Sequence, residues 1–177
     1  MGRSRYKIFE NEYPYFLTCT TVGWLPVFTR PVMRQFVYDS WKYLADHRGF
    51  QVFAFVILEN HLHLIAKSKD LATDIGDFKS FTARQIIDWL EERHVRTILS
   101  QFKSLKAAHK TDRTYQVWQE GSHPQQIQSD EMMLQKIEYI HTNPMERDYV
   151  DRPEDWKHSS ARAYLRQPCL YPVITDW

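Results

Sequence analysis

One nearly unbroken apolar segment constrains the fold of this chain more than any other feature. Residues 52–58 are all apolar, and a second apolar-rich segment at 61–66 follows after the two-residue break Glu59-Asn60. Short runs of β-branched and aromatic residues predict strands, and a run without a polar face predicts a strand buried on both sides. The two segments are therefore expected to form a hairpin, with strands over 51–58 and 61–66.

Three helices are expected from apolar residues that recur at helical spacing. The first should span 31–47, with Pro31 in its first turn, and the second 74–92, capped by Thr73 or Asp74. Ser129 is a suitable N-cap for a third helix. Pro144 should end that helix near Thr142, because the residue before a proline avoids helical angles.

Two further strands are expected, over 15–22 and 115–119, whereas 95–113 fits either a helix or a mobile basic loop. The resulting order is close to β-α-β-β-α-β. It predicts an α+β protein with a ferredoxin-like split βαβ fold, in which one face of an antiparallel sheet is covered by helices. A chain of 177 residues is most simply one domain over 1–177, with a core at about 10–150 and a tail, 151–177, that packs back onto it.

Composition limits the functional classes. An apolar fraction of 43% excludes a disordered chain, and a formal net charge of +1 gives no strong whole-molecule attraction to nucleic acid. Lys and Arg nevertheless outnumber Asp and Glu between residues 79 and 113, which fits a local basic surface or a solvated helix face. Two isolated cysteines, a polar N-terminus and no membrane-length apolar run predict a cytoplasmic protein without a signal peptide or membrane contact.

A pair of histidines opens the second strand of the hairpin. His61 and His63 point to the same face, because side chains alternate along a strand, and Leu62 points into the opposite layer. Neutral imidazole is available at pH 7, so this pair can bind one divalent metal ion. A third ligand must come from another element.

The third helix supplies candidates for that ligand and for a nucleophile. Tyr139 and Asn143 stand four residues apart and therefore on one helix face. Packed across the sheet, this helix could bring the Asn143 amide oxygen to the metal and the Tyr139 hydroxyl beside it. Two imidazoles and an amide oxygen, with positions left open, suit Mg²⁺ or Mn²⁺ better than a closed zinc site. A tyrosine beside such a metal favours phosphoryl transfer through a covalent phosphotyrosine.

The same residues resemble a known family. His61-Leu62-His63 resembles the HUH motif, in which two histidines flank a hydrophobic residue, and residues 139–144 resemble the tyrosine-bearing helix end of REP-associated tyrosine transposases. These belong to the single-tyrosine HUH transposases of bacterial insertion sequences. The resemblance covers most of the chain, including 16–22, 118–121 and 153–161.

This resemblance implies an HUH endonuclease fold, with a metal held by His61, His63 and Asn143 and a nucleophile at Tyr139. It also implies a 5′-phosphotyrosine link to single-stranded DNA and cleavage beside DNA hairpins, by a monomer or a homodimer. Phosphate contacts are expected from the basic region, and unpaired bases could stack on Tyr115, Trp118 or Trp156. The expected DNA-binding residues are Lys79, Arg84, Lys103, Lys106, Arg113 and Trp118.

Two other functions remain open from the sequence. The chain could be a non-catalytic, domesticated protein that only binds DNA hairpins. It could also be a metal-dependent hydrolase of a small phosphoester, with water rather than Tyr139 as the nucleophile.

Overall fold

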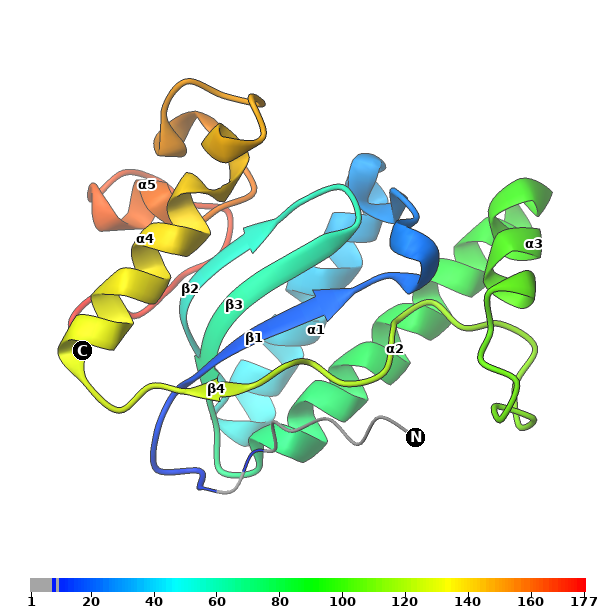
Figure 1. The fold of residues 1–177 in the computed structure, drawn as a ribbon, viewed down its shortest axis with the longest axis horizontal. Coiled ribbons are helices and arrows are strands. Elements are labelled where there is room, and N and C mark those ends of the chain that lie inside the picture. Colours follow the sequence, from blue (N-terminus) through cyan, green and yellow to red (C-terminus); the bar gives the residue numbers. More distant parts are fainter. Residues whose placement is uncertain (1–7, 9) are drawn as a thin grey trace.

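The computed structural model describes residue 8 and residues 10–177, and its centre is a four-stranded antiparallel sheet (Figure 1). The strand order is β2-β3-β1-β4, which is the arrangement expected of a split βαβ fold. Every pair of neighbouring strands is antiparallel. The strands are β1 (Tyr15–Thr20), β2 (Gln51–Ile57), β3 (His61–Lys67) and β4 (Gln125–Gln126).

Helices cover both faces of this sheet. α1 (Pro31–Arg48) and α2 (Leu71–Glu92) lie behind the sheet in Figure 1. α4 (Asp130–Glu146) lies beside β2 at the left of the view, and its buried side chains pack on the other face of the sheet. α3 (Arg96–Ser104) follows α2 at one side of the molecule, and α5 (Ala161–Tyr164) lies beside α4. Short 3₁₀ turns complete the fold: η1 (Val22–Trp24), η2 (Val27–Thr29) and η3 (Pro153–Asp155).

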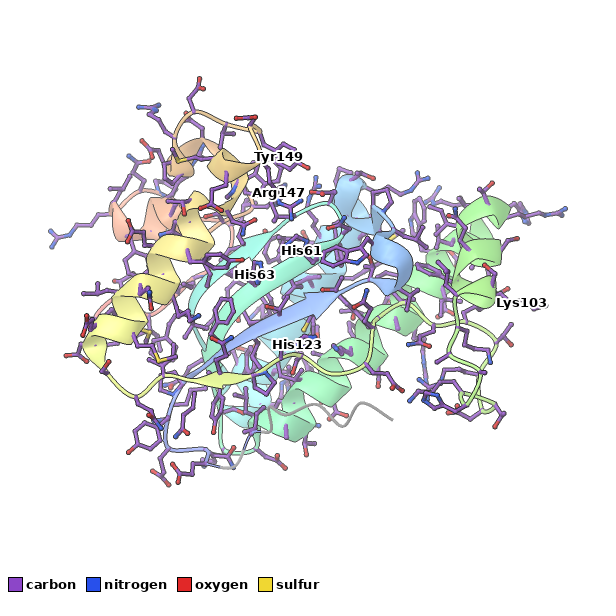
Figure 2. The ribbon with its side chains drawn as sticks, in the orientation of Figure 1. His61, His63, Lys103, His123, Arg147 and Tyr149 are labelled. Carbon is purple, nitrogen blue, oxygen red and sulfur yellow. The ribbon has the colours of Figure 1, made fainter. Side chains whose placement is uncertain are left out.

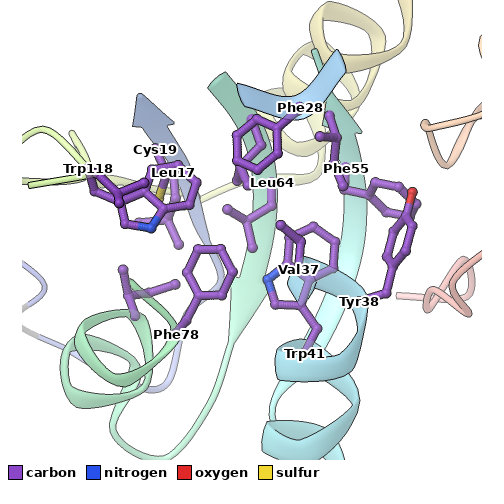
Figure 3. Close-up of a cluster of buried hydrophobic side chains, with 14 of the residues drawn as sticks. Leu17, Cys19, Phe28, Val37, Tyr38, Trp41, Phe55, Leu64, Phe78 and Trp118 are labelled. Atoms are coloured by element: carbon purple, nitrogen blue, oxygen red, sulfur yellow. The ribbon is translucent and has the colours of Figure 1, made fainter. Parts of the chain in front are cut away.

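Two hydrophobic cores result, one on each face. Alternate residues of β1 and β3, such as Leu17 and Leu64, pack with α1 and α2 around Trp41 and Phe78 (Figure 3). The intervening residues, among them Phe16 with Val56 of β2 and Ile65 of β3, pack with α4. The predicted antiparallel sheet with helices packed on it is confirmed, and helices cover the second face as well as the one that was expected. The unbroken apolar run of β2 is explained, because both of its faces are buried.

Several element boundaries differ from expectation for identifiable reasons. The fourth strand is Gln125–Gln126, whereas 115–119 makes only an isolated bridge between Trp118 and Thr21. Asp70, rather than Thr73 or Asp74, caps α2, because its side chain accepts the hydrogen bond of the Thr73 amide. Residues 96–104 of the ambiguous region form a helix.

Pro144 lies inside α4 and does not end it near Thr142. Helical angles are disfavoured before a proline but not forbidden, and burial can outweigh that preference. Ile140, Asn143 and Pro144 are all buried, so ending the helix early would expose this packed face. The N-cap at Ser129 is confirmed, since its side chain accepts the Met132 amide.

The C-terminal tail lies along the free edge of β2. The Ile57 amide donates to the His158 carbonyl, and the Ser160 amide donates to the Phe55 carbonyl. His141 of α4 is hydrogen-bonded to the Ser160 hydroxyl at 2.8 Å, which ties the tail to the helix as well. Within the part of the chain that the structure describes, no helix is both long and apolar enough to cross a membrane.

Candidate active site

His61 and His63 lie at the start of β3 and face α4. Leu62 and Leu64 belong to the opposite core, so the alternation of the strand turns both imidazoles toward the other face, as predicted. The ring centroids are 4.9 Å apart, and the side chains lie in front of the sheet in Figure 2. The two residues are only 3% and 6% exposed, so the pair is held in a largely dry environment.

Burial keeps both imidazoles neutral. It lowers the pKa of His61 to about 4 and that of His63 to about 3, because the charged form loses its hydration. Nearby positive charge from Arg147 lowers both pKa values further, and Lys136 adds to the effect on His63. Metal binding requires deprotonated nitrogen, so protons do not compete for these rings at pH 7.

Hydrogen bonds fix how each ring is presented. The Asn60 Oδ1 atom lies 2.6 Å from His61 Nδ1. An amide oxygen only accepts, so His61 Nδ1 carries the proton and Nε2 keeps its lone pair. His63 Nδ1 lies 2.9 Å from the Thr18 hydroxyl, on the residue paired with it across the sheet. Such partners orient metal-binding histidines.

Successive turns of helix α4 lie beside successive same-face residues of β3 and of the turn before it. The Tyr139 ring lies 5.3 Å from the His63 ring, and Arg147 Nη1 lies 3.2 Å from Glu59 Oε1. Four helix residues advance about 6 Å, close to the advance of two strand residues. Asn143 stands midway between Tyr139 and Arg147 along the chain, so we expect it to lie opposite His61, which stands midway between His63 and Glu59.

The Asn143 side chain has a buried oxygen that is available to a metal ion. It is 5% exposed, and its Oδ1 atom is buried without a hydrogen-bond partner among the described residues. A buried unpaired acceptor is costly and calls for an explanation. Residue 8 and residues 10–177 contain no cluster of three His, Cys, Asp or Glu side chains suited to a metal ion. Two imidazoles and this amide oxygen are the groups that could hold one.

Tyr139 combines a fixed ring with an accessible surface. Its ring meets the edges of His63 and Phe16, the latter at 5.8 Å, yet the residue remains 41% exposed. Lys136, one turn earlier on α4, lies 4.8 Å above the Phe16 ring. A phenol placed this way can meet a large substrate from solvent while staying next to the histidines of its own chain.

Comparisons with known proteins agree with this fold. The chain is 23% identical to a Haemophilus influenzae protein named "Putative REP-associated tyrosine transposase" over 139 residues, covering 78% of this chain and 73% of that one. It also superposes on a solved REP-associated tyrosine transposase bound to a REP hairpin, with a TM-score of 0.67 and 18% identity, over 100% of this chain and 91% of that chain. The chain has the fold of a REP-associated tyrosine transposase.

The resemblance inferred from the sequence is thus confirmed. No family model matches the chain. A solved Deinococcus radiodurans R1 protein, described as a "putative transposase", overlaps less well, with a TM-score of 0.43 and 18% identity, over 79% of this chain and 95% of that chain.

The expected DNA-binding residues are not gathered at the histidines. Lys79 and Arg113 line a cavity of about 290 Å³ beside α2, where Lys79 Nζ donates to the Gln119 carbonyl. Arg84 and Lys103 are exposed on α2 and α3, and Figure 2 shows Lys103 well away from the histidines. The Lys106 ammonium donates to the Lys110 carbonyl.

Trp118 is in the core rather than on a binding surface. It is 5% exposed, packs against Phe28 and Phe78, and its Nε1 donates to the Thr82 hydroxyl at 3.0 Å (Figure 3). The expectation that a base stacks on this ring was wrong, because the side chain is buried in the core. Of the other two aromatic residues, Trp156 is half-buried and stacks on Tyr149.

Sequence reasoning missed several residues that surround the histidines. Thr18 and Asn60 are hydrogen-bonded to the imidazoles of His63 and His61, respectively. Glu59 forms an ion pair with Arg147, and the Trp24 ring contacts the His61 ring. The position of Glu59-Asn60 next to the histidine pair was a usable signal. Thr18, Trp24 and Arg147 depend on the register of β1 against β3 and on the helix crossing, which the sequence does not reveal.

Proposed function

We propose that this protein is a metal-dependent single-stranded DNA endonuclease and strand transferase that cleaves next to DNA hairpins. One observation carries the proposal: the Tyr139 ring lies 5.3 Å from the buried, neutral His63 of the same chain. The solved relative was bound to a REP hairpin. A single-stranded DNA that contains such a hairpin is therefore the proposed substrate.

The proposed metal is Mg²⁺ or Mn²⁺, held by His61, His63 and Asn143. The unpartnered Asn143 oxygen and the two neutral imidazoles support this assignment. When bound, such an ion polarises the scissile phosphate and offsets the charge that develops on its oxygens. Thr18 and Asn60 would hold the two rings in the orientation that leaves one nitrogen of each ring for the ion.

Tyr139 is the proposed nucleophile. Its phenolic oxygen would attack the phosphorus, forming a bond to the 5′ phosphate while the bond from phosphorus to the 3′ oxygen breaks. The phenol proton ends, overall, on the released 3′ hydroxyl. The phosphotyrosine keeps the energy of the broken ester, so a 3′ hydroxyl can later attack it and rejoin the strand without ATP.

Local charge supports DNA binding here despite the small net charge of the molecule. Lys136 and Arg147 each lower the pKa of His63 through their positive charge, which places both cations close to the histidines, although Arg147 is also paired with Glu59. A cation beside a dry site can neutralise a phosphate of an approaching strand. The +1 net charge therefore does not argue against the proposal.

We further propose that one copy of the chain supplies a complete site. Tyr139, His63 and Asn143 come from the same polypeptide, so cleavage would need no residue from a second copy. The two cysteines are free, as expected for a protein in a reducing cytoplasm, which is the proposed location.

The test is formation of a covalent adduct with hairpin-bearing single-stranded DNA in Mn²⁺. Tyr139→Phe should abolish the adduct, and Tyr149→Phe is the matched control, because Tyr149 is a comparably exposed tyrosine near the same helix end. An adduct that survives Tyr139→Phe would remove the proposed nucleophile. Hairpin binding without cleavage in any divalent metal would instead identify a non-catalytic hairpin-binding protein.

A further inference from the structure

Trp24 is an exposed aromatic residue placed directly against the proposed metal site. It ends the short turn η1 that follows β1, and 54% of it is exposed. Its ring centroid lies 5.6 Å from that of His61, with the planes at 75°. The His61 ring thus contacts both Trp24 and His63, and the His63 ring in turn contacts Tyr139. A tryptophan that stays open to solvent at such a position needs an explanation.

The backbone at Trp24 has an unfavourable, left-handed conformation. Trp24 has φ of +55° and follows Gly23 at +60°, so two consecutive residues are left-handed. A bulky side chain rarely adopts this region, and residues that do so are enriched at functional sites. The Trp24 amide donates to the Thr21 carbonyl at 3.1 Å, and the Asn60 side-chain amide donates to the Trp24 carbonyl at 3.3 Å.

Asn60 links this conformation to the histidine. Its Oδ1 atom accepts from His61 Nδ1 while its Nδ2 atom donates to the Trp24 carbonyl, so one amide orients both residues. The main-chain oxygen of Asn60 accepts the Thr21 amide and the Thr21 hydroxyl, which fixes η1 on the hairpin turn. The Trp24 ring is therefore held in a defined place relative to His61.

We propose that Trp24 is a stacking platform for the unpaired nucleobase next to the scissile phosphate. This inference rests on the proposed function, because it takes single-stranded DNA as the ligand. An indole offers a flat surface that any base can stack on, whatever its hydrogen-bonding pattern. A base seated on Trp24 keeps its own nucleotide beside His61, so the adjoining phosphate lies over the histidine pair and within reach of Tyr139.

Stacking predicts a measurable loss on removing either partner. Alanine substitution at such a platform weakens binding by about 5- to 150-fold per base. Binding is best measured in a Tyr139→Phe background, in which cleavage is blocked, by the fluorescence anisotropy of an end-labelled DNA strand. Trp24→Ala removes the platform, and Trp24→Phe retains a smaller one. Tyr43→Ala is the control, because Tyr43 is 56% exposed on α1, behind the opposite face of the sheet.

The ligand is hairpin-bearing single-stranded DNA, compared with the same strand made abasic at each unpaired position in turn. For the protein that retains Trp24, one abasic position should weaken binding by the same factor as the Trp24→Ala substitution does. In the Trp24→Ala variant, that abasic position should have no further effect on binding. Trp24→Phe should keep most of the affinity, and the affinity for Mn²⁺ should stay constant throughout.

Three results would overturn the platform. If the loss of affinity from Trp24→Ala and the loss from an abasic position multiply at every position tested, no base is seated on Trp24. If Trp24→Ala lowers the affinity for Mn²⁺ but leaves the effect of every abasic position on DNA binding unchanged, the ring only shields His61 from solvent. Unchanged adduct formation in Tyr139-containing Trp24→Ala protein would reject the platform and retain the nuclease. Conversely, the abasic signature without any adduct would support the platform and reject the nuclease.

Discussion

Replacing Asn143 with leucine should stabilise the metal-free protein, although most buried substitutions destabilise. Asn143 Oδ1 is buried with no hydrogen-bond partner in the described structure. A buried polar group in this state costs about 1–3 kcal/mol, which an apolar side chain of similar volume avoids. For a chain of this size each kcal/mol is worth about 3 °C, so Asn143→Leu should raise the melting temperature of the metal-free protein by about 3–9 °C.

The same change should remove the response to metal. An ion present at 100 times its dissociation constant stabilises a protein by about 2.7 kcal/mol, or about 8 °C here. Thermal melts in EDTA and in Mn²⁺ would measure both effects on wild-type, Asn143→Leu and Ser68→Ala proteins. Ser68 is the matched control, because its Oγ atom is also buried and unpartnered but lies at the opposite end of β3.

Ser68→Ala should therefore gain stability in EDTA and keep the full Mn²⁺ shift. The reasoning fails if Asn143→Leu melts lower than wild type in EDTA while its Mn²⁺ shift remains. That pair of results would mean that the amide has a structural partner and is not a metal ligand.

Further predictions concern the residues around the site. Thr18→Val removes the hydroxyl that is hydrogen-bonded to His63 Nδ1 and should weaken Mn²⁺ binding by about 10- to 100-fold in calorimetry. Thr18→Ser should retain most of the affinity. Equal affinities in all three proteins would show that this hydrogen bond does not contribute to metal binding. Burial lowers the pKa of His158 to about 4, below its unfolded value near 6.5, so the unfolded chain takes up the proton first and stability should fall between pH 6.5 and 4. His158→Gln should make that fall less steep in urea titrations, while His61 and His63 still contribute to it, and an unchanged slope would contradict this role of His158. Gly23→Ala places a left-handed β-carbon against Leu105 and should lower stability by about 1 kcal/mol or more in the same titrations; no change would show that the η1 backbone is not constrained.

Much of the site could be predicted because it depends on local periodicity. The two-residue period of a strand sets His61 and His63 on one face, with Leu62 and Leu64 in the other core. The helical period sets Tyr139 and Asn143 on a common face. The apolar run of β2 also predicted burial on both sides, and it should have indicated that the last helix covers the second face.

The remaining features depend on tertiary packing. Residues 115–119 have strand-like composition, yet Trp118 fills the core beside Phe78, and the short β4 falls on two glutamines with no strand signal. Pro144 reads as a helix end, but burial of its helix face outweighs that preference. Trp24 and Thr18 reach the histidines only through the pairing of β1 with β3.

Locating the covalent phosphate tests the central claim most directly. Trypsin should cut after Lys136 and Arg147, releasing residues 137–147, a peptide in which Tyr139 is the only tyrosine. After reaction with hairpin-bearing single-stranded DNA in Mn²⁺ and digestion of the DNA, tandem mass spectrometry should place a nucleotide or phosphate on Tyr139 in that peptide. A modification on any other residue, or strand cleavage with this peptide unmodified at every time point, would contradict the account.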